Sequence, residues 1–322
     1  MEQSTFSKAR AKFSSVQELG VLAVLLVIGA VLSLTTKSFL NPTNLINVVR
    51  QFSEISIMAV GMSFVIICAE IDLSIGSIYG VCAIIAAYLL NRGGDPTVAF
   101  LAALGAGTVI GFLNGFLVTK CRVPAFIATL SMMQIVRGGA YAISRGWPIS
   151  QFPSVNNWFF GMGERVAGIP IQIFIMIAIN IAASLVLSKT TVGFQTYAVG
   201  GNANASRLSG INNGMVKTIA FMLSGALAAL GGMVGLAYLQ SVAATAGAGR
   251  ELDVIAAVII GGTSMSGGKG TILGTFLGAA IMGVVRNGMV LLGVQAYYQE
   301  AFIGLVILVA VLADTWLKQA RK

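Results

Sequence analysis

Two carboxylates interrupt a long apolar part of the chain. Glu70 and Asp72 stand in the stretch 69–77, and the hydroxyl of Ser74 follows them. Acids between two apolar segments are costly to bury in a bilayer and are candidates for a solute path or a gate. The alternative is that Asp72 or Ser74 caps the next helix, where a carboxylate or hydroxyl meets free N–H groups and the helix dipole.

Residue types that several catalytic mechanisms need are missing. The chain has no histidine, which excludes Ser-His-Asp and Cys-His nucleophiles and histidine-ligated metals. The stretch 261–270 superficially resembles a phosphate-binding loop, but that motif needs glycine where Thr263 stands and Ser or Thr where Gly270 stands. We therefore predict no catalytic residue, no metal, no cofactor and no ATPase site, and interpret 261–270 as a tight hairpin. None of the three cysteines belongs to a C-x-x-C pair: Cys68, Cys82 and Cys121.

A third polar stretch lies between Lys189 and Lys217 and is rich in glycine and asparagine. It predicts a short helix from Asn202 to Leu208, with Asn202 as N-cap and Gly210 as the C-terminal stop. A helix of this kind in a long loop suits the docking of a soluble partner, and the alternative is a passive interfacial helix. The predicted docking residues are Gly200, Gly201, Asn202, Ala205, Arg207, Leu208 and Gly210.

The composition of the chain indicates that these residues are positioned by transmembrane helices. Of the 322 residues, 57% are hydrophobic and 10% are charged, against roughly a quarter charged in soluble domains. The stretches 96–119, 166–188 and 218–249 carry no charge, and about 20 apolar residues suffice to cross a bilayer. The basic residues that give the net charge of +9 are scattered singly, so no nucleic-acid-binding face is predicted. The sequence predicts an all-α, polytopic membrane protein that contacts the lipid bilayer.

We predict ten transmembrane helices, with eight as the alternative because the second and eighth are short enough to be broken or re-entrant. The first follows three basic residues and resembles a signal peptide, but many spans come after it, which favours an uncleaved span. The ten predicted spans are 20–36, 54–69, 74–91, 97–119, 124–143, 167–188, 215–239, 253–264, 271–292 and 298–315.

The distribution of basic residues predicts orientation. With the N-terminus inside, twelve Lys and Arg fall in cytoplasmic segments and six outside, which obeys the positive-inside rule. Residues 1–18 and 317–322 are then cytoplasmic tails, and 19–316 form a single transmembrane domain. Arg137 and Arg286 lie within spans, and we expect them to line the outward mouth of a path or to snorkel to the outer interface.

Regularly spaced glycines and a weak internal repeat predict how the helices pack against one another. Gly107, Gly111 and Gly115 form a doubled G-x-x-x-G, which predicts close helix contact. The tripeptide at 104–106 recurs 173 residues later at 277–279, and Asn-Gly recurs at the same offset. With ten spans these copies run in opposite directions, and inverted repeats are typical of transporters.

Ordered motifs from about residue 40 to the C-terminus resemble the permease subunits of ribose-type ABC importers. They include Ile-Asp-Leu-Ser-Ile-Gly-Ser at 71–77, Pro-Ala-Phe-Ile-Ala-Thr-Leu at 124–130, and Gly-Gly-Asn at 200–202 with Arg-Leu-Ser-Gly-Ile-Asn at 207–212. The stretches 256–264 and 267–270 also match. Glu70 departs from many relatives, which have glycine at this position.

The resemblance implies a permease of the bacterial inner membrane that pairs with a second permease copy. It also implies a separate ATPase with tandem nucleotide-binding domains, which 200–210 would contact, and a periplasmic sugar-binding protein. The implied cargo is a monosaccharide such as ribose, xylose, arabinose or galactose, with autoinducer-2 or another small polar solute as the alternative. A secondary transporter is a weaker hypothesis, because Arg137 and Arg286 do not titrate and so provide no proton relay.

Overall fold

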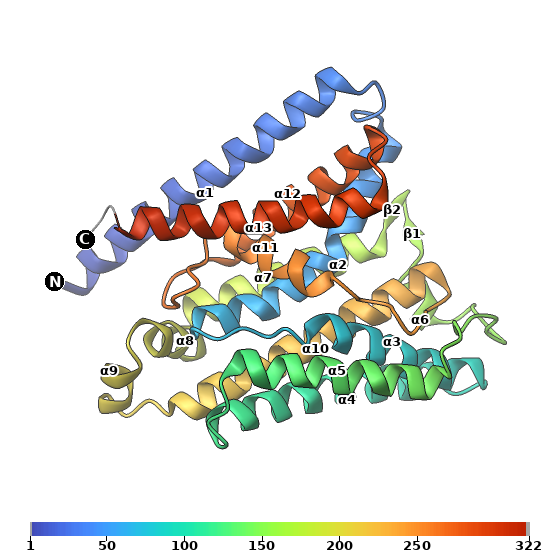
Figure 1. Ribbon diagram of the computed structural model, residues 1–322, viewed down its shortest axis with the longest axis horizontal. Coiled ribbons are helices and arrows are strands. Elements are labelled where there is room, and N and C mark those ends of the chain that lie inside the picture. The colour runs from blue at the N-terminus through green and yellow to red at the C-terminus, as the bar shows by residue number, and fades with distance from the viewer. Residues whose placement is uncertain (1, 320–322) are drawn as a thin grey trace.

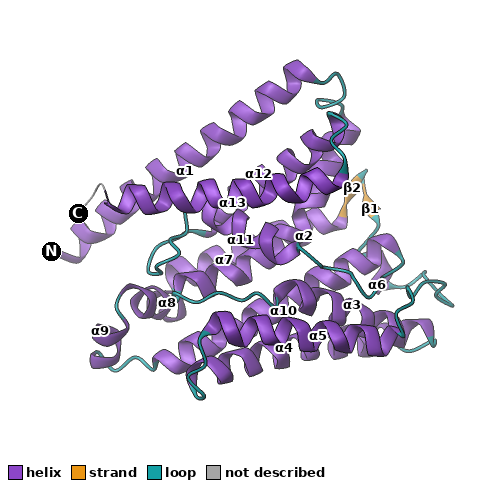
Figure 2. Cartoon of the chain, in the orientation of Figure 1, coloured by secondary structure: helices purple, strands orange, loops and turns teal. Residues whose placement is uncertain are grey.

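The computed structural model describes the backbone of residues 2–319 and the side chains of 18–295, 297–309 and 312 (Figure 1). Helices account for most of this backbone, and two short strands form one hairpin (Figure 2). The prediction of an all-α, polytopic protein is confirmed. The elements are α1 (Glu2–Thr35), α2 (Pro42–Ile67), α3 (Ile75–Asn91), α4 (Pro96–Thr119), α5 (Ala125–Ser144), α6 (Trp158–Gly161), β1 (Arg165–Val166), β2 (Ile169–Pro170), α7 (Ile171–Lys189), α8 (Thr191–Gly201), α9 (Ala203–Leu208), α10 (Asn213–Leu239), α11 (Arg250–Ile260), α12 (Ile272–Leu291) and α13 (Ala296–Gln319).

Each predicted span falls on a helix of the described chain, but the count of ten full crossings is not confirmed. Seven helices are long and apolar enough to cross a membrane: Glu18–Thr35 within α1, and α2, α4, α5, α7, α10 and α12. The helix α3 has 17 residues, and the stretch of α13 whose side chains are described without a gap, Tyr297–Val309, is apolar. The helix α11 has 11 residues and rises about 16 Å, roughly half the hydrocarbon thickness. The eighth predicted span is therefore short, as expected.

The prediction of a short second span at 54–69 is wrong. The helix α2 has 26 residues and begins at Pro42, because the side chain of Asn41 accepts a hydrogen bond from the Thr43 N–H and proline suits the first helical position. The helix then continues through Arg50 and Glu54. Hydropathy alone placed the start at Glu54, after Arg50, whereas ion pairing allows both charges to lie inside the helix.

Two helices are preceded by non-helical chain that folds back along the previous helix. The helix α2 ends at Ile67, and residues 68–74 lead back to α3, beside α10 (Figure 1). Likewise α10 ends at Leu239, and residues 240–249 lead back to α11. Because α2 ends near α8 and α10 begins near α9, the two units run in opposite directions.

The predicted inverted repeat accounts for the packing. In this repeat, α2, α3, α4 and α5 correspond to α10, α11, α12 and α13, in that order. The α4–α10 contact then has the α12–α2 contact as its counterpart, and the α3–α4 contact has α11–α12. The α3–α5 contact becomes α11–α13 in the same way. The 104–106 and 277–279 copies lie in α4 and α12, as this relation requires. The helices α1 and α7 do not follow the relation, since α1 packs on α12 while α7 packs on α2.

Glycines of α4 allow α10 to approach at backbone distance. A Cβ atom added at Gly107 would lie 2.7 Å from the Ala229 Cβ, and one added at Gly111 would overlap the Phe221 carbonyl. In lipid there is no hydrophobic drive between apolar helices, so association depends on such close packing. The doubled G-x-x-x-G thus forms the α4–α10 seam.

We expect Gly111→Leu to lower the thermal stability of the purified protein strongly, because the new side chain must separate α4 from α10. The matched control is Gly105→Leu on the same helix, where an added Cβ meets nothing within 4 Å. The measurement is the thermal unfolding midpoint in detergent. Equal midpoints for the two variants would contradict this account of the seam.

Candidate functional site

Asp72 lies fully buried in the segment that leads back to α3. Its Oδ1 accepts hydrogen bonds from the Ser74 backbone N–H at 3.0 Å and from the Ser74 hydroxyl at 2.6 Å. Its Oδ2 accepts from the Ser224 hydroxyl of α10 at 2.9 Å, and Asn114 of α4 donates to the Ser74 Oγ at 2.8 Å. The carboxylate therefore accepts a hydrogen bond from the backbone N–H just before α3, as a helix cap would. Through Ser224 it also joins the start of α3 to α10.

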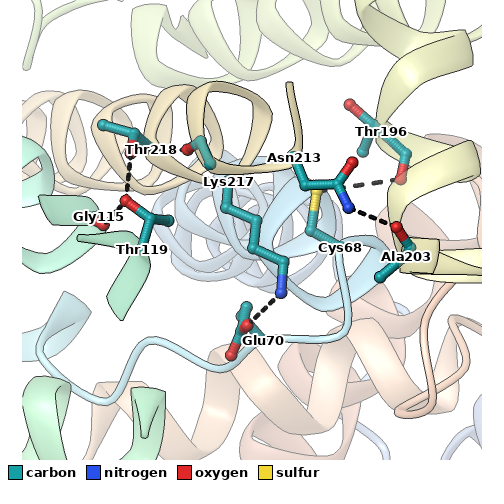
Figure 3. A network of polar contacts seen from close by, with 10 residues as sticks. Cys68, Glu70, Gly115, Thr119, Thr196, Ala203, Asn213, Lys217 and Thr218 are labelled. Carbon is teal, nitrogen blue, oxygen red and sulfur yellow. Dashed lines mark hydrogen bonds and ion pairs between the residues drawn. The ribbon is translucent and has the colours of Figure 1, made fainter. Parts of the chain in front are cut away.

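Glu70 lies two residues earlier and forms an ion pair with Lys217 of α10 at 2.5 Å (Figure 3). One turn before Lys217, the side chain of Asn213 donates to the Ala203 carbonyl at 2.7 Å and accepts from the Ser206 hydroxyl at 2.9 Å. Both of those residues belong to α9. The start of α10 therefore connects α9 to the acidic segment.

The helix predicted at 202–208 is confirmed as α9. The side chain of Asn202 accepts hydrogen bonds from the backbone N–H groups of Asn204 and Ala205, at 3.1 and 3.0 Å. Gly210 follows with a positive φ of 83°, which suits the predicted C-terminal stop. Leu208 is 87% exposed, although it is apolar. The helix α9 therefore presents a leucine at its free surface, with Ala205 and Arg207 also exposed.

Gly200 and Gly201, which the sequence predicts as docking residues, lie at the end of a helix that packs against other parts of the protein. They are the last residues of α8, and a Cβ added at Gly200 would overlap the Ile67 carbonyl at the end of α2. That carbonyl accepts the Gly268 N–H at 2.9 Å, and the Tyr197 hydroxyl donates to the Gly270 carbonyl at 2.6 Å. The predicted 261–270 hairpin thus packs against α8 and α2. The missing side chain of Gly200 allows the end of α8 to approach the end of α2 closely.

Arg286 of α12 pairs with an acid that sequence reasoning missed. Its Nη2 lies 2.8 Å from each carboxylate oxygen of Asp253 in α11, and Glu300 of α13 is 3.8 Å away. Arg286 lies five residues before the end of α12, and its position in the outer half of the membrane stays a prediction. Its contact is a bidentate ion pair between helices.

Glu54 was also missed. Its carboxylate accepts the Tyr79 hydroxyl at 2.8 Å, lies 3.1 Å from Arg250, and is 4.0 Å from Arg50 one turn earlier. The spacing of Arg50 and Glu54 by four residues was a readable signal of helical pairing. The sequence interpretation placed both Arg50 and Arg250 outside the membrane spans, and so did not look for buried partners.

Arg137 of α5 contacts backbone instead of an acid. Its Nη1 donates to the Ala246 carbonyl at 2.7 Å and to the Ala244 carbonyl at 3.4 Å. Both carbonyls belong to the non-helical segment 240–249, whose peptide groups need partners inside the protein. Arg137 therefore holds this segment in place, and a role at the mouth of a path stays a prediction.

This arrangement defines a class of protein. A body of membrane-crossing helices contains two inverted units, each with non-helical chain and polar side chains inside the body, and such broken segments line paths in transporters. An exposed helix at one end is connected to one of these segments. The class is a multi-pass membrane transport permease.

Comparison with known proteins identifies the family. Residues 44–311 match the family described as branched-chain amino acid transport system / permease component. The chain is 45% identical over 297 residues to the ribose import permease protein RbsC of Escherichia coli K12, covering 91% of this chain and 92% of the relative. The RbsC protein of Bacillus subtilis is 40% identical over 316 residues, covering 97% and 98%. The L-arabinose ABC transporter permease protein AraH of Azospirillum brasilense is 33% identical over 303 residues, covering 94% and 89%.

The chain therefore belongs to this family of permease components, and within it to the ribose-type ABC importer permeases. It is a transport subunit and not an enzyme. No solved structure matches it.

The ion pair between Glu70 and Lys217 predicts a rescue by charge exchange. Glu70→Lys or Lys217→Glu alone places like charges together and should lower transport, whereas the double variant restores an attractive pair and should recover most of it. The measurement is solute uptake at matched membrane expression. Lys189→Glu, at an exposed site at the end of α7, controls for the charge change itself. A double variant no better than the worse single variant would contradict a direct coupling.

Proposed function

We propose that this chain is the permease subunit of an ATP-driven importer that carries a monosaccharide, ribose above all, into the bacterial cytoplasm. The observation that carries the proposal is the 45% identity to a ribose import permease over 91% of the chain. The arabinose permease is a more distant match, at 33% identity. Xylose and galactose stay within the same proposed class of cargo.

The proposal includes three partners. An ATPase with tandem nucleotide-binding domains supplies the energy, because the glycine-rich stretch 261–270 does not fit the phosphate-loop pattern. A periplasmic sugar-binding protein delivers the cargo, and a second permease copy completes the path. The exposed apolar surface of Leu208 on α9 supports the ATPase contact, since an isolated surface of this kind suits burial against a partner.

We also propose that both termini face the cytoplasm, in the inner membrane. The basic residues favour this orientation twelve to six. In addition, the start of α1 and the helix α9 lie at one end of the molecule, and α6 with the β1–β2 hairpin lies at the other (Figure 1).

The function is tested by reconstituted uptake. We expect cells without native ribose uptake to import radiolabelled ribose when they express this chain with the ATPase and binding protein encoded beside it. Because the energy comes from ATP, uptake should survive a protonophore and stop on ATP depletion. Uptake with the opposite sensitivities would indicate a secondary transporter. Import of autoinducer-2 without ribose would overturn the proposed cargo.

Orientation is tested by single cysteines in a protein whose exposed Cys121 is replaced by serine. Asn157 caps α6, so the exposed neighbour Asn156 is the better outer site, and Asn204 on α9 is the inner one. An impermeant maleimide applied to spheroplasts should label a cysteine at 156 and not one at 204. The reverse result would invert the proposed topology.

Docking through α9 predicts that Ala205→Glu disrupts coupling. A charge inserted into a packed contact loses its water without gaining a partner, so uptake and ATPase co-purification should both fall by about tenfold or more. Ala205→Ser is the matched control and should keep both. Membrane insertion and affinity for the binding protein should be unchanged, because they depend on the other end of the molecule.

Crosslinking addresses the same contact directly. A cysteine at Asn204 should crosslink to some position in a cysteine scan of the ATPase surface. Crosslinks from 264–270 in the absence of any from 204 would move the docking element to that hairpin.

A further inference from the structure

A cavity of about 390 Å³ lies between α2, α11, α12 and α13, in the half of the molecule away from α9. Small-molecule pockets typically occupy about 300–1,000 Å³, so the space suits a monosaccharide with some water. Three arginines and three acids line it: Arg50, Glu54, Arg250, Asp253, Arg286 and Glu300.

The charges of this lining balance and are largely paired with one another. Arg250 lies 3.1 Å from Glu54, and Arg286 lies 2.8 Å from Asp253. With three positive and three negative side chains, the cavity carries no net charge. An ionic solute would have to break these pairs to find a partner, and breaking a buried pair is strongly unfavourable.

A neutral polyol meets no such penalty. Each hydroxyl group can donate to a carboxylate oxygen and accept from a guanidinium N–H, and bonds to charged groups are stronger than neutral ones. The Arg50 guanidinium lies 4.0 Å from the Glu54 carboxylate and 4.0 Å over the Tyr238 ring, so it too is held by neighbours in the lining.

The inverted repeat indicates that the fold does not need a charge at three of these six positions. At the repeat offset of 173, Arg250 and Asp253 of α11 correspond to Ser77 and Gly80 of α3. At the offset of 173, Arg286 of α12 corresponds to Leu113 of α4. At these three positions the first unit has uncharged residues. The charges of Arg250, Asp253 and Arg286 therefore point to a task beyond folding.

We infer that this cavity, defined by the paired charges Glu54–Arg250 and Asp253–Arg286, is a binding subsite for an uncharged polyhydroxylated solute on the outer half of the transport path. The inference rests on the proposed function. It adds a physical reason why charged analogues of the sugar are excluded from the path. The net neutrality of the lining selects against sugar acids and amino sugars, while the individual charges hold hydroxyl groups.

The test uses a cysteine in the wall of the cavity, in the complete importer reconstituted in liposomes. Ala248 lines the cavity and is exposed, so Ala248→Cys in a Cys121→Ser background provides one reactive thiol, with Cys68 and Cys82 buried. Two methanethiosulfonates of similar size, one cationic (trimethylammonioethyl) and one anionic (sulfonatoethyl), modify it from outside. A cysteine at Asn156, on the outer loops, serves as the control site.

We expect D-ribose to slow modification at 248 and not at 156, and the corresponding aldonate to give no protection. Arg286→Gln should raise the ratio of cationic to anionic rates roughly tenfold, because it leaves one uncompensated negative charge nearby. Asp253→Asn should shift the ratio in the opposite direction. The double variant should restore it, which separates the electrostatic effect from misfolding.

Ribose import without protection at 248, or equal protection by the aldonate, would overturn the subsite and leave the proposed function intact. Absence of ribose import in the unmodified complex would count against the proposed function instead. The labelling readout does not require turnover, so protection tested with other neutral pentoses and hexoses would still decide whether the cavity binds uncharged sugars.

Discussion

Backbone peptide groups inside a bilayer must find hydrogen-bond partners within the protein, and this constraint governs the two non-helical segments of the fold. In 68–74, Asp72 accepts the Ser74 N–H, and the Thr129 hydroxyl of α5 reaches the Ile71 carbonyl at 3.4 Å. In 240–249, Arg137 of the same helix covers the carbonyls of Ala244 and Ala246. The helix α5 therefore supports both segments, one through a hydroxyl and the other through a guanidinium. Removing either support would leave polar backbone exposed to an apolar interior.

The segment 68–74 is also linked by polar contacts to distant parts of the chain. Glu70 meets Lys217 across 147 residues, and Asn213 joins that part of α10 to α9. Under the proposed docking, a displacement of α9 would pass to α10 and, through the Glu70–Lys217 pair, to the segment that contains Asp72. The polar contacts are short and partly shielded, so they can transmit force where isolated surface pairs would yield to water.

Local patterns in the sequence predicted the local features. Apolar length gave the helices, the doubled G-x-x-x-G gave the α4–α10 seam, and Asn202 with Gly210 gave the limits of α9. The long-range pairings were not predictable, because nothing in the spacing of Glu54 and Arg250 indicates that they meet. The start of α2 was misplaced for the same reason, since a charge counts against a span unless its partner is known. The packing role of Gly200 could not be predicted, because the residue it contacts, Ile67, is 133 positions away in the chain.

The glycine seam between α4 and α10 has a mechanical consequence. Where side chains interdigitate, two helices can slide by exchanging rotamers, but here backbone meets backbone and few rotamers are available to exchange. Sliding by even one residue would drive the Phe221 carbonyl against a neighbour that has a Cβ. The two helices, which belong to different repeats, are therefore expected to move as one stiff body. If a partner displaces α9 as proposed, α4 and α10 should tilt together, so that both ends of the seam move at the same moment.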